Sequence, residues 1–312
     1  MLAPGAAVRT TAAATLQPTL RSLAIRPLAI SAAVRDALAF GDPIVRAEHS
    51  HGVSLGMRRS EDAIFMSTPG IGLLPAHIVV RARDLERVLD AIDDSDASAF
   101  DSGDALTLRL DVEGVRTFRP MLTPRPQSIE SAHARANIAA VARWLRASAL
   151  PLGLGATASE LLAPRGRWRK LLVDLHCDSA SAARTLRALV GLGAGTTPAG
   201  DDFATGVIAH AWATEGWNAP VIAAMRSLEA ELPRLTTDAG ATYIRAAARG
   251  EFGSHLIEWV RALPRVSASR ALTLALRVAG HGATSGCDTL VGFIAAAEAQ
   301  GAARSTALPD RR

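Results

Sequence analysis

The spacing of hydrophobic and polar residues changes once along the chain. Between residues 41 and 123, short apolar or alternating runs predict strands at 44–48, 52–58, 63–67, 77–81, 106–112 and 115–121. A helix is predicted at 83–92, because Leu85, Val88, Leu89 and Ile92 recur at helical spacing. Only Glu113 and Gly114 separate the last two strands, which predicts that these strands pair as a hairpin.

From about residue 129 the apolar positions follow helical spacing almost to the end of the chain. Helices are predicted at 130–148, 158–163, 168–175, 179–192, 198–215, 219–231, 237–249, 255–263, 267–279 and 285–300. We therefore expect an α+β protein, with a β-rich N-terminal domain at 29–126 and a larger all-α domain at 127–305. Residues 1–28 are interpreted as a disordered or over-extended leader, although their arginines and lack of acids also resemble a transit peptide.

The composition indicates a globular protein and excludes several classes of partner. The chain carries 34 basic and 30 acidic residues, and the first 35 residues hold four of the basic ones and no acidic one. The remainder is neutral overall, which argues against nucleic-acid binding. No apolar stretch is long enough to predict a membrane span. The two cysteines, Cys177 and Cys287, favour a reduced, cytoplasmic protein over one built on disulfides.

The predicted helical domain contains an internal repeat with an offset of 86 residues. The pattern SAxRxL at 181–186 recurs at 267–272, and GxDxxxG at 200–206 recurs at 286–292. Each copy is predicted to be a helix, a glycine-rich turn and a second helix that opens with the GxD motif. If the two copies pack about a pseudo-twofold axis, both turns face one site.

The first turn, GLGAGTTPAGDD at 191–202, predicts a binding site for a small anion. Thr197 is a natural N-cap, and Pro198 suits the first helical position. A helix N-terminus preceded by glycines presents N–H groups to phosphate or carboxylate. The turn lacks the lysine of a P-loop and follows a helix, unlike a dinucleotide-binding turn. The candidate binding residues are Gly193, Gly195, Thr196, Thr197, Gly200 and Asp201.

The acids that end this turn, Asp201 and Asp202, have three interpretations. Acidic side chains in a first helical turn interact favourably with the helix dipole. Two acids beside an anion site also suit a Mg²⁺-bridged phosphate, or the N–H groups of a substrate amide. We therefore leave Mg²⁺ open as a cofactor and predict no other metal site.

The second turn, GHGATSGCDT at 280–289, supplies a further set of candidates. Ser285 and Asp288 have the spacing of a capping box, a structural role that accounts for both residues without any ligand. His281 is placed where a proton donor or an oxyanion stabiliser acts. The candidate binding residues of this turn are Thr284, Ser285 and Gly286, and the candidate catalytic residues are His281 and Asp288, with Asp202 from the first turn.

A third segment, TTxxGAxxxxRxxxRG at 236–250, lies between the two copies. Arg245 and Arg249 share one helical face, since they are four residues apart. We interpret Arg245 as an anchor for a carboxylate or phosphate. For Arg249, pairing at the surface or at the helix end accounts for the charge.

The two turns resemble those of the AllH family, which is associated with a subunit of oxamate carbamoyltransferase. That family shows GLGxGLTPSGDDxLxG and, later, GHSSGxDxLxG; this chain reads GLGAGTTPAGDDFATG at 191–206 and GHGATSGCDTLVG at 280–292. The resemblance includes residues 70–80 and 236–250 and covers roughly 30–300. Ala199 stands where the family usually has serine and Cys287 where an aromatic residue is common, which puts one polar substrate contact in doubt.

The resemblance implies a role in ureide breakdown, beside two other types of subunit. There, oxalurate and phosphate are exchanged with oxamate and carbamoyl phosphate. Such a transfer needs a phosphate cradle, a carboxylate anchor, acceptors for the carbamoyl NH₂ and donors for an oxyanion. The glycine turns, Arg245, the pair Asp202 and Asp288, and His281 fit these four roles in that order.

Two other functions fit the same residues. In the first, the chain is a non-catalytic regulatory or assembly subunit, and its glycines serve helix packing; Gly206 and Gly292 lie inside predicted helices. In the second, it is a Mg²⁺-dependent nucleotide or phosphoryl-transfer enzyme that uses Asp201 and Asp202.

Overall fold

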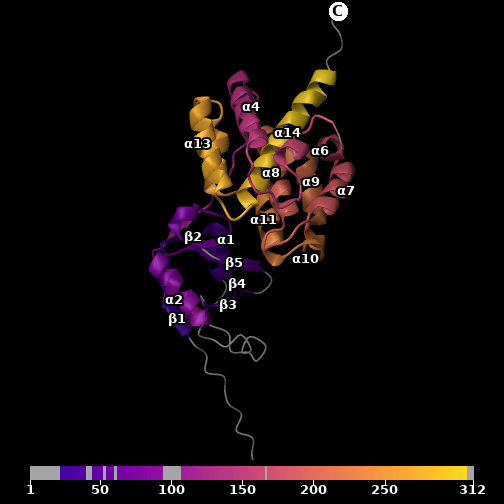
Figure 1. The fold of residues 1–312 in the computed structure, drawn as a ribbon. Coiled ribbons are helices and arrows are strands. Elements are labelled where there is room, and N and C mark those ends of the chain that lie inside the picture. The colour runs from indigo at the N-terminus through magenta and orange to yellow at the C-terminus, as the bar shows by residue number, and fades with distance from the viewer. Residues whose placement is uncertain are drawn as a thin grey trace, which may run out of the picture.

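The computed structural model describes residues 22–39, 44–51, 54–59, 62–93, 107–165 and 167–307. A sheet with two helices forms one end of the molecule, and a larger, wholly helical region forms the other (Figure 1). The chain therefore has the predicted α+β fold. None of the helices in the described part of the chain combines the length and apolarity needed to cross a bilayer.

Within the described residues, eight strands form one mixed sheet with the order β1-β7-β3-β4-β5-β6-β2-β8. The strands are β1 (Ser22–Ile25), β2 (Ala29–Ser31), β3 (Ile44–His51), β4 (Ser54–Arg59), β5 (Asp62–Ser67), β6 (His77–Val79), β7 (Thr107–Leu110) and β8 (Arg116–Phe118). The pairs β1–β7, β5–β6 and β2–β8 are parallel, and the others are antiparallel. The strand β1 falls within residues 1–28, so the sheet includes part of the segment interpreted as a leader.

The predicted hairpin between 106–112 and 115–121 is wrong. The strand β7 pairs with β1 and β3, whereas β8 pairs with β2 at the other end of the strand order. Only residues 26–28 join β1 to β2, and the four Cα–Cα steps from Ile25 to Ala29 span at most about 14 Å. The sheet must therefore curl until its two ends approach each other. Arg35 strengthens this closure by donating to the carbonyl oxygens of Val112 and Val115, at 3.0 and 2.7 Å.

Two helices accompany the sheet, and the rest belong to the helical region. They are α1 (Ala32–Ala39) and α2 (Ala82–Asp93), followed by α3 (Pro126–Ile129), α4 (Ala132–Ala147), α5 (Ala158–Leu161), α6 (Arg167–Cys177), α7 (Ser179–Leu189), α8 (Ala199–Thr214), α9 (Pro220–Leu228), α10 (Leu232–Leu235), α11 (Asp238–Ala248), α12 (Ser254–Ala262), α13 (Ala268–Ala279) and α14 (Ser285–Ala307). Short 3₁₀ turns lie at Pro69–Ile71, Gly216–Asn218 and Glu229–Glu231. Helical spacing located every long helix of this region. Most of these helices bury an apolar stripe, whereas α8 and the first half of α14 are buried on almost every face.

The two repeat copies meet where α8 crosses α14 in the core of the helical region. A Cβ atom on Gly206 would lie 2.0 Å from the carbonyl oxygen of Thr289, and one on Gly292 would lie 2.1 Å from that of Phe203. Phe203 and Thr289 are themselves 86 residues apart, so the two contacts are equivalent under the repeat. The duplicated helix–turn–helix unit therefore packs against itself in the reciprocal way that a pseudo-twofold pair requires.

Backbone hydrogen bonds hold the sheet region against the helical region. The amide of Ser254 donates to the carbonyl of Leu73, and the amide of Leu73 donates to the Ser254 hydroxyl, at 2.8 and 2.9 Å. Nearby, the amide of Phe252 donates to Pro120 at 3.0 Å. These contacts place the loop after the first 3₁₀ turn beside the beginning of α12.

Candidate functional site

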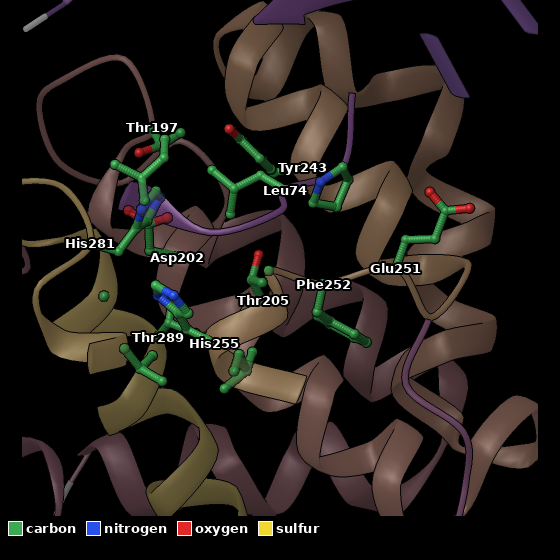
Figure 2. A pocket seen from close by; sticks show the side chains of 16 residues that line it. Leu74, Thr197, Asp202, Thr205, Tyr243, Glu251, Phe252, His255, His281 and Thr289 are labelled. Carbon is green, nitrogen blue, oxygen red and sulfur yellow. The ribbon is translucent and has the colours of Figure 1, made fainter. Parts of the chain in front are cut away.

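A pocket lies between this loop and the first turns of α8 and α14 (Figure 2). It contains about 670 Å³ of space not filled by atoms, part of which is open to solvent. The sheet region contributes apolar residues to its wall: Ile71, Leu74 and Pro75. The helical region contributes the polar residues Thr197, Asp202, Thr205, Tyr243, Glu251, His255, His281 and Thr289, and the others Phe252, Gly253, Leu256, Val278 and Gly286.

The two glycine turns converge at this pocket. The hydroxyl oxygens of Thr197 and Ser285 are 3.0 Å apart, although 88 residues separate them in sequence. The helix α8 begins at Ala199, and Thr197 makes no capping bond, so the predicted N-cap is wrong by one position. The Thr197 hydroxyl is therefore free to face the second turn.

Asp202 is the most strongly perturbed acid of the pocket. The pKa of its carboxyl is raised from 3.8 to about 8, mainly by burial and also by the nearby Asp288 and Asp201, while hydrogen bonds from the hydroxyls of Ser285 and Thr197 oppose the shift. The buried Oδ2 atom has no hydrogen-bond partner among the described residues. At neutral pH Asp202 therefore presents a proton to the pocket, whereas the sequence analysis expected an acceptor.

His281 presents a second unpartnered polar atom. Its Nδ1 atom is buried and has no hydrogen-bond partner in the described part of the chain. Burial lowers the pKa of the imidazole, and the nearby imidazole of His255 lowers it further. The ring is therefore neutral at physiological pH and carries one N–H donor and one acceptor nitrogen. Its main-chain carbonyl accepts from the amide of Gly286 at 2.9 Å, which fixes the turn.

The other two acids of the motifs hold loops and do not line the pocket. Asp288 is 0% exposed, and both its oxygens accept from the amide of Gly153, at 3.1 and 3.2 Å. The capping box with Ser285 is therefore not formed. Asp201 accepts from the amide of Gly191 at 2.7 Å and from the hydroxyl of Thr236. Burial raises the pKa of both carboxyls.

The role of Asp288 leads to a stability prediction. Replacing Asp288 with Ala should destabilise the protein by roughly 1–3 kcal/mol, because the part-buried hydrogen bonds from the Gly153 amide and the Thr284 hydroxyl lose their acceptor. Urea unfolding measures the loss, and limited proteolysis should show earlier cleavage between residues 150 and 157. Asp174→Ala, in α6, is the control and should change little; equal stability of Asp288→Ala and the wild type would contradict this role.

The backbone of the turns is arranged differently from the prediction. The amides of Gly200 and Gly286, equivalent under the repeat, donate to the carbonyls of Leu192 and His281. These two N–H groups are therefore used by their own turns and do not face a ligand. Gly193 and Gly195 adopt φ values of +105° and +106° and are exposed on the first turn, outside the pocket wall.

Three further candidates lie beside the pocket without lining it. The carbonyl of Thr196 accepts from the Thr237 hydroxyl, which also caps α11. Thr284 donates its hydroxyl to Asp288 and lowers the pKa of that carboxyl. Arg245 lines a neighbouring cleft between α1 and α11, together with Arg249 and Thr242. Of the thirteen candidates, Thr197, Asp202, His281 and Gly286 line the pocket, and Ser285 contacts it through Thr197.

One part of the site, where the sheet region joins the helical region, was not predicted from the sequence. His77, from β6, lies between the Ser67 hydroxyl and the Tyr243 hydroxyl, at 2.9 and 2.6 Å. Tyr243 is the only tyrosine of the chain and belongs to the 236–250 segment. That segment was identified, but its partner is 166 residues away on a strand, and no spacing links the two.

The acids do not form the arrangement that a Mg²⁺ ion bridging a phosphate would need. Asp201 is turned toward Gly191 and Thr236, and Asp202 is protonated at neutral pH. Within the described residues, no three histidine, cysteine, aspartate or glutamate side chains are grouped as metal ligands. We therefore derive no step through a metal ion.

The comparison with protein families matches part of the chain. Residues 189–297 match the model of a family described as oxamate carbamoyltransferase subunit AllH. The predicted resemblance is thus confirmed for a stretch that contains both glycine turns and α11, and this stretch is shorter than the 30–300 range expected. No solved structure matches the chain.

Proposed function

We propose that this chain is a subunit of a cytoplasmic carbamoyltransferase and that its pocket binds phosphate, carbamoyl phosphate or oxamate. The observation that carries the proposal is the contact between the Thr197 and Ser285 hydroxyls beside the protonated carboxyl of Asp202. The matched family supports the reaction class, since it is named for a subunit of such an enzyme. Other subunits complete the enzyme.

The polar end of the pocket suits a small anion. Two hydroxyls, the Asp202 carboxyl and the neutral His281 ring supply donors, and among the described residues no lysine or arginine lines the pocket wall. The helices α8 and α14 both begin there, so the positive ends of two helix dipoles face the same space. Leu74 and Phe252, which also line the pocket, limit the access of water.

The same groups suit carbamoyl transfer. A phosphate oxygen attacks the carbamoyl carbon of oxalurate, and the bond between that carbon and the oxamate nitrogen breaks. His281 donates to the oxygen that becomes negative. Asp202 gives its proton to the leaving nitrogen, and the proton released by hydrogen phosphate returns to Asp202. A carboxyl with a pKa of about 8 is suited to both steps near neutral pH.

Binding by the isolated chain tests the pocket directly. Phosphate and oxamate should each raise the melting temperature in a saturable way, because a ligand stabilises the state to which it binds. The double variant Thr197→Val/Ser285→Ala should weaken this binding at least tenfold, since it removes both hydroxyls. The matched control Thr273→Val/Ser269→Ala makes the same changes on exposed positions of α13. Equal binding by the two double variants would overturn the proposal.

A second candidate function is that of a non-catalytic assembly subunit. Its supporting observation is that Gly200, Gly206, Gly286 and Gly292 all pack against a carbonyl oxygen that a Cβ atom would strike. Packing explains these four glycines fully, but it does not explain a buried carboxyl that lies beside two hydroxyls and has one oxygen, Oδ2, without a partner among the described residues. This candidate predicts no saturable shift with phosphate or oxamate, so the same titration separates the two functions.

A further inference from the structure

Three polar side chains, linked by hydrogen bonds, lead from the sheet region into the pocket. The Ser67 hydroxyl lies 2.9 Å from Nδ1 of His77, and Nε2 of His77 lies 2.6 Å from the Tyr243 hydroxyl. Ser67 and His77 are buried, with exposed fractions of 0% and 1%. Tyr243 is only partly buried and lines the pocket.

The ring of Tyr243 is fixed by its neighbours. It stacks on Phe65 with the ring centroids 5.4 Å apart and the planes inclined by 12°. Its hydroxyl end points to the side of the pocket on which Thr197 and Asp202 lie (Figure 2). Burial raises the pKa of Tyr243, and ionisation of Asp202 at alkaline pH raises it further, so the phenol keeps its proton.

The hydrogen-bond partners of His77 decide which group donates and which accepts in each of these two hydrogen bonds. Burial lowers the pKa of His77 to about 3, so the ring is neutral and only one of its nitrogens carries a proton. If that nitrogen were Nδ1, it would donate to Ser67, whose own proton would then have no acceptor among the described contacts. With the proton on Nε2, Ser67 donates to Nδ1 and Nε2 donates to Tyr243. The Tyr243 proton is then free to point into the pocket.

We propose that Tyr243 donates a hydrogen bond to the bound anion, and that His77 is a positioning residue that fixes this donor by holding its own proton on Nε2. The proposal rests on the proposed function, because it needs an anion in the pocket. Through Ser67 of β5 and His77 of β6, the sheet region then positions a hydrogen-bond donor that neither glycine turn supplies. The proposal also sets the class of ligand: a group with an oxyanion at the position that Tyr243 reaches.

Binding measurements test the donor. Tyr243→Phe should weaken the binding of phosphate or oxamate by about tenfold to a hundredfold, the range for a hydrogen bond to a charged group. The phenyl ring keeps the stack on Phe65, so the fold should be preserved. Thr242→Val is the matched control. It removes a hydroxyl from the preceding position of α11, and that hydroxyl bonds within its own helix. Its binding should equal that of the wild type.

The tautomer of His77 tests the positioning role without any substitution. The ¹⁵N chemical shifts of the two ring nitrogens should show the proton on Nε2 in the wild-type chain, free and saturated with phosphate. A proton on Nδ1 in the saturated protein would overturn the proposal, as would unchanged binding by Tyr243→Phe. Failure of the wild type to bind phosphate or oxamate would overturn the proposed function as well. Unchanged binding by Tyr243→Phe, together with weak binding by Thr197→Val/Ser285→Ala, would overturn only this inference.

Discussion

Replacing Asp202 with Asn should lower the turnover of the assembled enzyme by about 10²- to 10⁴-fold, the range for loss of general acid–base catalysis. Asparagine has the shape of the protonated carboxyl and still donates a hydrogen bond, but it cannot give up a proton. The KM for phosphate should therefore change much less than kcat. Formation of carbamoyl phosphate from oxalurate and phosphate measures both. Asp174→Asn is the control and should keep the wild-type turnover; a wild-type kcat in Asp202→Asn would remove the proton-transfer role.

The same variant should be more stable than the wild type at alkaline pH. The Asp202 carboxyl titrates near 3.8 when unfolded and near 8 when folded. Between these values the folded state holds a proton that the unfolded state has lost, so the wild type loses up to about 1.4 kcal/mol per pH unit as the pH rises. Asparagine does not titrate. The free energy of unfolding of Asp202→Asn, relative to that of the wild type, should therefore grow from about pH 4 to pH 8 and then level off. Urea midpoints at pH 5 and pH 8.5 measure the difference, and an advantage that shrinks with rising pH would contradict the buried, protonated carboxyl.

The substitution Gly206→Ala should destabilise the protein by about 3 kcal/mol or more, at the upper end of the range for overpacked cores. The new Cβ atom would lie 2.0 Å from the Thr289 carbonyl oxygen and 2.7 Å from the Phe293 nitrogen, so α8 and α14 would have to separate. Alanine favours a helix over glycine by at most about 1 kcal/mol, which does not offset this clash. Gly292→Ala should have a similar effect, because it makes the equivalent contact with Phe203.

Urea unfolding checks this prediction, with Gly280→Ala as the control. Gly280 ends α13 with a φ of −74°, and a Cβ atom there would come no closer than 3.5 Å to its nearest neighbour. The control should stay within about 1 kcal/mol of the wild type. A Gly206→Ala variant as stable as this control would mean that the two helices are not packed as closely as described.

The sequence predicted the two-part fold and nearly all the long helices, because most of them bury a stripe of apolar residues that recurs at a helical period. It also predicted the repeat, since glycine and aspartate at matched positions are informative in a chain rich in alanine. Strand pairing was predicted less well. The runs that form β7 and β8 were placed correctly, but their partners lie far away in sequence, and a short loop between two strands does not by itself pair them.

In the candidate site, too, the sequence pattern identified residues but did not predict which of them face the pocket. Asp201 and Asp202 are adjacent in sequence and look interchangeable, yet one holds the Gly191 turn and the other lines the pocket. Their directions differ because successive residues of a helix point about 100° apart. Arg245 follows the same rule: it is two positions from Tyr243 and therefore faces the neighbouring cleft.

By itself, the sequence determined the local structure: helices, the two glycine turns, and an acid and a hydroxyl at the start of each repeated helix. The tertiary structure alone decided which of these groups lie together in the pocket and which of them are protonated. The close crossing of α8 and α14 places Thr197 beside Ser285, and burial there keeps the proton on Asp202. The docking of the sheet adds His77 and Tyr243. Hydration, burial and contacts across more than a hundred residues depend on the whole fold, so no local pattern encodes them.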